Sequence, residues 1–246
     1  MEKLLMNVKL ISFTQPPIQV HSDGMVHGGV ENGGKYLNND LIKLVAYCAR
    51  VSNPSNQYND ETSEKLINYL IRWKHWSPFE MVNVCLEIET TRDIARQILR
   101  HRSFSFQEFS QRYADPTADL SFALREARLQ DDKNRQNSID VDDPVLQDEW
   151  NSMQQELITL SKKTYSWAIS KGIAKEVARA VLPEGLTLSR MYMNGTLRSW
   201  IHFLEIRTHK STQKEHREVA RACAQVISEI FPMINNFSLS ETDNAE

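Results

Sequence analysis

A cationic stretch from Arg100 to Tyr113, RHRSFSFQEFSQRY, constrains this chain more than any other part of it. The stretch carries too many charges to be buried without partners, yet its three phenylalanines argue against a loose solvated tail. Guanidinium groups bind phosphate through paired hydrogen bonds, and hydroxyl, amide and carboxylate groups complete such sites. The alternative is a surface helix or loop laced with ion pairs, which an isolated patch would favour.

The segment before this stretch predicts a rigid support for it. Residues 82–89 alternate apolar and polar side chains, which is typical of a half-buried strand. Thr90 or Thr91 can then cap a helix with an apolar stripe on one side. Arg92, Arg96 and Arg100 are spaced by four residues and share another side of this helix. A strand followed by a helix would therefore hold the cationic stretch in a fixed position.

The remaining pattern predicts a mixture of strands and helices. Strands or extended segments are expected at 7–13 and 187–192, and a flexible glycine-rich loop at 18–36. Helices are expected from Asn39 or Asp40 to near Pro54, and over 62–74, 122–129 (short), 144–171, 174–182, from Thr196, and from Thr212 with Glu215 in a capping box. The fold class is therefore α+β, with a central, mostly antiparallel sheet flanked by helices.

Two further expectations concern burial. The long helix over 144–171 should bury a stripe of large apolar side chains: Trp150, Met153, Leu157, Leu160 and Trp167. His209 and His216 are expected at a helix end and on the surface.

Residues 114–144 are polar and acidic, which indicates a surface excursion within a domain rather than a linker.

Composition limits the classes of function. Apolar residues make up 41% of the 246 residues and charged residues 25%, as in ordinary globular proteins. The formal net charge of −3 means that any basic site is local, which disfavours a nucleic-acid-binding protein. Three widely spaced cysteines indicate neither a disulfide framework nor a metal site and fit a reducing cytoplasm. No apolar run reaches the length of a membrane span.

The cationic stretch resembles the signature of flavin-dependent thymidylate synthases. Arg-His-Arg is followed after seven residues by Ser110, with Glu108 two residues before that serine and Arg112 two residues after it. Further similar elements are Ser77-Pro-Phe-Glu, Gln97 three residues before Arg100, ARAVLP around Arg179, and LRSWIHFLEIR. Gln107 stands where the family usually has Asn, so a contact there is expected to differ. Met81 replaces a common family His, so any role of that His is absent here.

The resemblance implies one catalytic domain over 1–237, with the excursion at 114–144 and a disordered tail at 238–246. It implies a homotetramer with active sites shared between subunits, no nucleic acid or membrane partner, and a location in the cytoplasm, or in the host cytoplasm if the source is viral. The residues expected to line FAD are Ser77, Arg100, His101, Arg102, Glu108, Thr196, Arg198 and His202. Those expected to hold deoxyuridine monophosphate (dUMP) are Gln97, Arg100, Glu108, Ser110, Gln111, Arg112, Arg179 and Arg207.

The resemblance also implies a reaction. Methylenetetrahydrofolate would supply the carbon, NADPH would reduce FAD, and the reduced flavin would pass a hydride to the pyrimidine, giving thymidine monophosphate (dTMP). Arg207 would be the catalytic residue, stabilising the negative charge that develops as the ring nitrogen loses its proton. No protein nucleophile and no metal are needed in this scheme, and Ser110 is then a nucleotide ligand.

Two other functions remain open from the residues. A nucleic-acid-binding module would use the arginines on phosphates and would stack bases on Phe104, Phe106 and Phe109. The spacing of these aromatic side chains and the acidic overall charge disfavour it. An inactive structural homologue that keeps the fold is the other alternative, and only an assay of turnover separates it from an enzyme.

Overall fold

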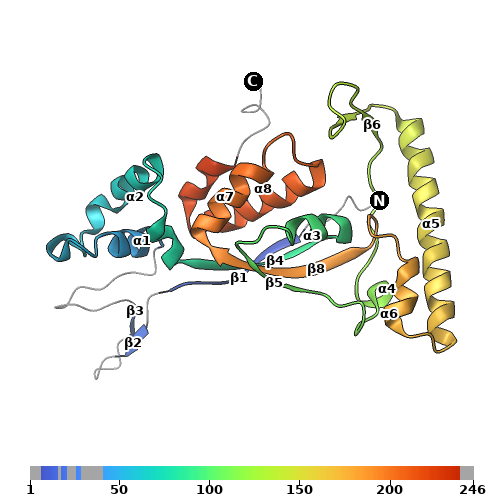
Figure 1. Ribbon diagram of the computed structural model, residues 1–246, viewed down its shortest axis with the longest axis horizontal. Helices are drawn as coiled ribbons and strands as arrows, with labels where there is room; N and C mark the ends of the chain where they lie inside the picture. Colours follow the sequence, from blue (N-terminus) through green and yellow to red (C-terminus); the bar gives the residue numbers. More distant parts are fainter. Residues whose placement is uncertain (1–6, 16–17, 21–25, 29–40, 239–246) are drawn as a thin grey trace.

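The computed structural model describes residues 7–15, 18–20, 26–28 and 41–238. Its centre is a four-stranded antiparallel sheet in the order β1-β4-β8-β5 (Figure 1). The strands are β1 (Asn7–Phe13), β4 (Asn83–Thr91), β5 (Ser105–Glu108) and β8 (Leu188–Thr196). The strand predicted over 7–13 and the half-buried strand after residue 81 are confirmed.

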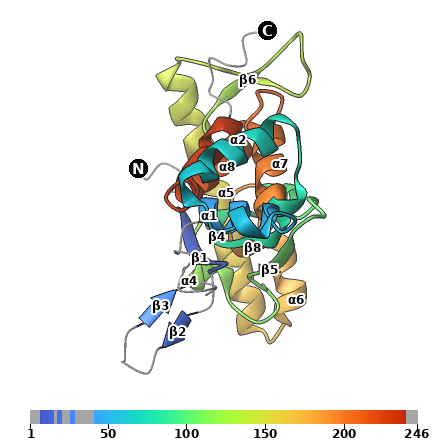
Figure 2. The same ribbon diagram turned by 90° about the vertical axis from the view of Figure 1, so that its left-hand side faces the viewer.

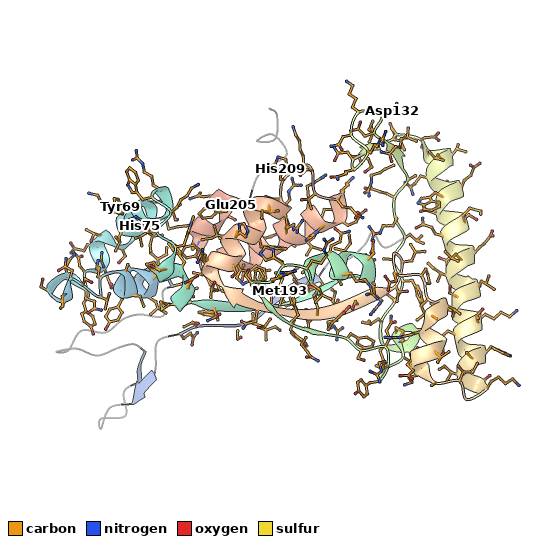
Figure 3. The ribbon with its side chains drawn as sticks, viewed as in Figure 1. Tyr69, His75, Asp132, Met193, Glu205 and His209 are labelled. Carbon is orange, nitrogen blue, oxygen red and sulfur yellow. The ribbon has the colours of Figure 1, made fainter. Side chains whose placement is uncertain are left out.

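Alternation along β4 and β8 decides which face of the sheet is buried. Leu86 pairs with Met193, and both side chains are fully buried on the helical side. Met193 lies in the middle of the sheet below the helices (Figure 3). Glu87 pairs with Tyr192 on the opposite face, which Figure 1 shows without a helix over it among the described residues. The period of two in the sequence therefore produces one apolar and one polar face.

Helices lie over the apolar side of the sheet, and the first two in the chain lie beyond one of its ends (Figure 1). They are α1 (Leu41–Ala49), α2 (Ser63–Arg72), α3 (Arg92–Ile98), α7 (Leu197–Arg207) and α8 (Lys214–Ser228). Trp200 of α7 is fully buried, and its indole nitrogen donates a hydrogen bond to the carbonyl oxygen of Val84 at 3.0 Å. Short 3₁₀ turns connect these elements: η1 (Pro54–Asn56), η2 (Asp60–Thr62), η3 (Ser77–Met81) and η5 (Pro232–Phe237).

The long helix α5 (Pro144–Ser170) stands at one end of the molecule beside α6 (Lys175–Ala178) and η4 (Arg179–Val181) (Figure 1). Asp143 caps α5 by accepting a hydrogen bond from the Leu146 amide at 3.0 Å, and Gly172 follows it with a positive φ of 77°. The excursion before α5 contains α4 (Pro116–Asp119), β6 (Arg128–Gln130) and β7 (Ser138–Asp140). Figure 3 labels Asp132 at its tip.

The α+β class with an antiparallel sheet and flanking helices is confirmed, but several local predictions are wrong. Residues 122–129 form no helix; a short helix precedes them at 116–119, and 128–130 form β6. The glycine-rich loop includes two paired strands, β2 (Ile18–Val20) and β3 (Val26–Gly28), which lie apart from the central sheet (Figure 2). The residues predicted to cap α1 and the tail from 239 lie outside the described residues.

The capping box predicted at the start of the last helix is also wrong. Helix α8 begins at Lys214, and its N-cap residue is Gln213. Glu215 instead forms ion pairs with Arg125 at 2.9 Å and Arg128 at 2.6 Å. Two guanidinium groups compete successfully with a backbone amide for this carboxylate, because charge-assisted pairs are the stronger hydrogen bonds.

The predicted buried stripe of α5 is wrong for the single chain. Its five members are 43% to 62% exposed: Trp150, Met153, Leu157, Leu160 and Trp167. The helix packs through its other side, where Gln154, Ile158 and Tyr165 are buried. Periodicity identified an apolar face correctly, but it could not say whether the same chain covers that face. A contiguous apolar face of this kind is typical of a protein–protein contact.

No helix among the described residues is both long and apolar enough to cross a bilayer.

Candidate active site

The cationic stretch is held against the sheet by Phe104. This ring is 8% exposed and lies edge-on to Trp200, with the ring centroids 4.8 Å apart. Phe106 and Phe109 are partly buried as well. The three aromatic side chains therefore do not form the exposed platform that base stacking requires.

Gly195 of β8 allows this packing. A Cβ atom at position 195 would lie 2.4 Å from the nearest carbon of the Phe104 ring. We therefore expect Gly195→Ala to push this ring out of its buried position and to lower the free energy of unfolding by about 1–3 kcal/mol, the usual cost of overpacking. Chemical denaturation measures this change. An unchanged midpoint would contradict the proposed contact.

A cleft of about 450 Å³ lies beside α7. Its lining includes Arg198 and His202 of α7, together with Glu205, which Figure 3 labels on that helix. Arg198 forms an ion pair with Glu80 of η3. Lys74 adds a second cation to the lining, and Glu80 and Glu205 balance the two positive charges, so the cleft offers separate cationic and anionic groups and no net formal charge.

The N-terminal end of α7 is fixed next to this cleft. Thr196 caps the helix, as predicted, by accepting a hydrogen bond from the Ser199 amide at 3.2 Å. Ser199 donates its hydroxyl to the carbonyl oxygen of Ser103 at 3.2 Å, which joins the cationic stretch to α7. Ser77 is the exposed first residue of η3, and Arg102 is exposed next to Ser103.

His101 lies between the cleft and the interior. Its ring is 5.5 Å from the ring of His202 and 5.6 Å from that of Phe203, measured between centroids. Burial, followed by the charges of His202 and Arg207, lowers the pKa of His101 to about 4. The imidazole is therefore neutral at neutral pH.

Arg207, at the last turn of α7, carries a charge that the described residues leave incompletely satisfied. Its Nε atom is buried without a hydrogen-bond partner in the described part of the chain. Burial and the positive charge of Arg100 lower its pKa, although the group stays protonated. Two neighbouring cations in a partly dry place form a strong anion site.

A hydrogen-bonded group of three side chains lies behind these arginines. Gln97 of α3 donates its amide nitrogen to Gln213 Oε1 at 2.8 Å, and its Oε1 lies 3.2 Å from His216 Nδ1. The expectation that His216 lies on the surface is wrong, because its ring is fully buried. Its place on the helical stripe that also contains Val219, Cys223 and Ile227 was the signal that would have shown this.

His216 makes an acid dependence of stability measurable. Burial, then the charges of Arg207 and His101, lowers its pKa to about 3, whereas an unfolded histidine has a pKa of about 6.5. Because the folded pKa is depressed, the stabilisation is complete above about pH 6.5 and is lost as the pH falls toward 3. At pH 5 we expect a loss of about 2 kcal/mol in the free energy of unfolding from this group alone.

The control for this prediction is His216→Asn, which cannot titrate in this range. Denaturant unfolding at about pH 7 and about pH 5 should show a smaller pH-dependent loss for the variant than for the parent protein. Equal losses would show that His216 does not titrate differently in the two states.

Glu108 lies at the end of β5, away from the cleft. It accepts a hydrogen bond from the Ser189 hydroxyl at 2.8 Å and lies 3.6 Å from Arg92. Ser110 precedes the turn at 111–113, and Gln111 is 4% exposed with a buried Nε2 atom that has no partner among the described residues. An unsatisfied buried donor of this kind is a place where an acceptor of a ligand would fit.

Arg112 and Arg179 belong to the end of the molecule near α6. Arg112 forms an ion pair with Glu176 of α6 at 3.3 Å, and Lys175 donates to the carbonyl oxygen of Tyr113 at 2.8 Å. Arg179 is the first residue of η4, directly after α6. Figure 1 shows α6 beyond one end of the sheet and α7 over its middle.

The structure thus divides the predicted site residues into two groups. One group surrounds α7: Ser77, Gln97, Arg100, His101, Arg102, Thr196, Arg198, His202 and Arg207. The other extends from β5 toward α6: Glu108, Ser110, Gln111, Arg112 and Arg179. Sequence reasoning missed Lys74, Ser189, Gln213 and His216. It placed Glu80 in a family element, Arg92 on a helix side and Glu215 in a capping box, without assigning them to the site.

Comparisons with known proteins give a consistent result. The family model of thymidylate synthase complementing protein matches residues 36–233. A probable flavin-dependent thymidylate synthase of Paramecium bursaria Chlorella virus 1 is 46% identical over 93% of this chain and 97% of the relative. A flavin-dependent thymidylate synthase of Synechocystis is 45% identical over the same shares of the two chains.

The fold also matches a solved structure. A crystal structure of a UMP/dUMP methylase PolB from Streptomyces cacaoi, bound with 5-Br UMP, superimposes with a TM-score of 0.75. The alignment covers 96% of this chain and 94% of that one, at 22% sequence identity. At this identity the likeness concerns the fold.

Proposed function

The chain belongs to the thymidylate synthase complementing protein family, whose members include flavin-dependent thymidylate synthases, and on this premise we propose that it methylates dUMP reductively to dTMP. Methylenetetrahydrofolate is the carbon donor and NADPH the reductant in this proposal. The observation that carries it is the packing of the His101 ring against His202 of the cleft, where the positive charges of Arg100 and Arg207 also act.

The residues around α7 fit FAD chemically. A pyrophosphate needs cationic and neutral donors, and the cleft offers Lys74, Arg198 and His202. Ser77, Arg100, His101, Arg102 and Thr196 complete the proposed FAD contacts around α7, and Glu108, which lies away from this cleft, is the one proposed FAD contact from the other group. When bound, FAD reduced by NADPH would supply the hydride for the reaction.

Arg207 has the features of the catalytic residue in this proposal. Its guanidinium is partly dry, lies near a second cation and has an Nε–H without a partner among the described residues. A pyrimidine ring that loses a proton between its two carbonyl groups becomes anionic, and a fixed cation favours this form. His101, held neutral by burial, can contact a ligand without adding a third charge.

Eight residues would hold the nucleotide: Gln97, Arg100, Glu108, Ser110, Gln111, Arg112, Arg179 and Arg207. The buried amide nitrogen of Gln111 supports this assignment, because a ligand acceptor would satisfy it. Arg112 and Arg179 lie near α6 rather than beside α7 in the same chain. This separation supports active sites that are shared between subunits, where arginines near α6 of one subunit face α7 of another.

The exposed face of α5 supports a homotetramer. Its first four large apolar residues recur at spacings of three, four and three, and Trp167 follows seven residues later, which is the pattern of helix-to-helix contacts. Some of them line a cleft of about 700 Å³ together with Pro183 and Leu186, and a second subunit would fill this space. All three cysteines are free, which agrees with the proposed location in the cytoplasm, or in the host cytoplasm if the source is viral.

A direct assay tests the proposed reaction. FAD-loaded protein is incubated with dUMP, methylenetetrahydrofolate and NADPH, and dTMP is measured, with each component omitted in turn. We expect dTMP only in the complete mixture. Nucleotide binding without dTMP and without dUMP-dependent NADPH oxidation would indicate the inactive structural homologue instead.

A further inference from the structure

A continuous series of hydrogen bonds joins the proposed nucleotide site to the polar excursion. It runs from His216 to Gln97, then to Gln213 and Glu215, with donor–acceptor distances of 3.2, 2.8 and 2.9 Å. Glu215 is held in turn by Arg125 and Arg128 of the excursion at 2.9 and 2.6 Å. Each member except Gln97 lies outside the residues that the family resemblance assigns to the site.

The direction of these hydrogen bonds follows from the charge of Glu215. This carboxylate is 4% exposed, and although burial opposes its charge, Arg125 and the other donors lower its pKa to about 2. An ionised carboxylate only accepts hydrogen bonds, so Gln213 must turn its amide nitrogen to Glu215. The Gln213 oxygen then faces Gln97, which must donate its own amide nitrogen.

The same reasoning fixes the proton of His216. With the nitrogen of Gln97 turned to Gln213, its oxygen faces His216 Nδ1 and requires a donor there. The neutral imidazole therefore carries its proton on Nδ1. The Nε2 atom has no partner among the described residues. Gln97 is partly exposed and keeps one unused N–H, which suits an acceptor on an anionic nucleotide.

We propose that Gln213 and His216 are positioning residues that hold the Gln97 amide in a single orientation, with one N–H left for dUMP. This inference rests on the proposed function only in naming dUMP as the ligand. The proposal also gives the 114–144 excursion a role. Its residues Arg125 and Arg128 hold the Glu215 carboxylate, and this carboxylate determines how the amides of Gln213 and Gln97 are oriented. Without these partners the amide can rotate and offers its oxygen as often as its nitrogen.

The main test is a double-mutant cycle with dUMP affinity as the readout. Calorimetry of FAD-loaded protein should show that Gln213→Leu weakens dUMP binding about tenfold, the typical effect of one hydrogen bond to a charged ligand. In a Gln97→Leu background the same substitution should change the affinity by less than about twofold, because the group to be positioned is gone. Gln225→Leu, an exposed position on α8, is the matched control and should leave the affinity unchanged.

A second arm uses His216. Asn can place an amide N–H near the position of Nδ1, so His216→Asn should retain most of the affinity that His216→Leu loses. If His216→Leu does not fold, the Gln213 cycle decides alone. Unchanged affinity in Gln213→Leu, or equal losses in both backgrounds, would overturn the positioning role even if the parent protein makes dTMP. If the parent protein binds dUMP but makes no dTMP, the proposed reaction is overturned. The double-mutant cycle can still be measured in that case, because its readout is dUMP affinity.

Discussion

Arg207→Ala should lower kcat for dTMP formation by about 10²–10³-fold, the usual effect of removing a group aimed at a developing anion in a dry site. The thermal stability of this variant should not fall together with its kcat. The Arg207 side chain is partly buried, its Nε atom has no partner in the described part of the chain, and Arg100 repels it. Removing such a charge relieves a desolvation cost, so the midpoint of thermal unfolding should stay the same or rise.

Two variants serve as controls for this result. Arg207→Lys keeps the charge but loses the planar fork of donors, so its kcat should lie between those of the parent and the alanine variant. Arg96→Ala removes an exposed arginine of α3 that pairs with Glu184, and should leave kcat within about twofold of the parent, since exposed ion pairs contribute little. A parent-like kcat in Arg207→Ala would remove this residue from the mechanism.

The second large effect concerns assembly. The paired substitutions Trp150→Glu and Leu157→Glu should reduce the mass of the particle in solution and abolish dTMP formation. Burying each of these large side chains contributes about 2 kcal/mol per subunit contact, and a buried unpaired carboxylate opposes the contact strongly. Loss of activity follows if arginines near α6 complete the site of a neighbouring subunit. Light scattering during gel filtration measures the mass.

The opposite side of α5 provides the matched control. Gln155 and Ser166 are exposed and lie away from the apolar face, so Gln155→Glu with Ser166→Glu adds the same charge to the same helix. This pair should leave mass and activity at parent levels. A parent protein that is monomeric and active, or a Trp150/Leu157 variant of unchanged mass, would contradict the role of this face.

Much of the fold could be predicted from the sequence because the signals were local. The alternation of apolar and polar residues in β4 acts within a few residues. The same holds for the Thr196 cap of α7 and for the proline and glycine at the two ends of α5. Whether the apolar face of α5 is buried could not be predicted. Periodicity shows that a helix has an apolar face, but it does not show what covers that face. The start of α8 was misjudged because Arg125 and Arg128, far away in the chain, take the carboxylate of Glu215.

The candidate site also combines residues that sequence patterns predict with residues that only long-range contacts reveal. The residues that repeat a family motif stay predictions as site residues, and the structure packs one of them, His101, against His202 and Phe203 of α7. His216 and Gln213 were missed, because neither belongs to a motif. Their importance follows from contacts across about 120 residues of sequence, between α3 and the start of α8. Only a folded structure shows such pairs.

The measurement that tests the central claim most directly is the visible absorption spectrum of FAD-reconstituted protein during titration with dUMP. A ring stacked near the flavin changes the flavin environment, so we predict bound flavin bands whose shift saturates at one nucleotide per subunit. The shift should need far more dUMP in Arg207→Ala. Protein that stays colourless after reconstitution, or flavin bands that dUMP does not alter, would contradict the account.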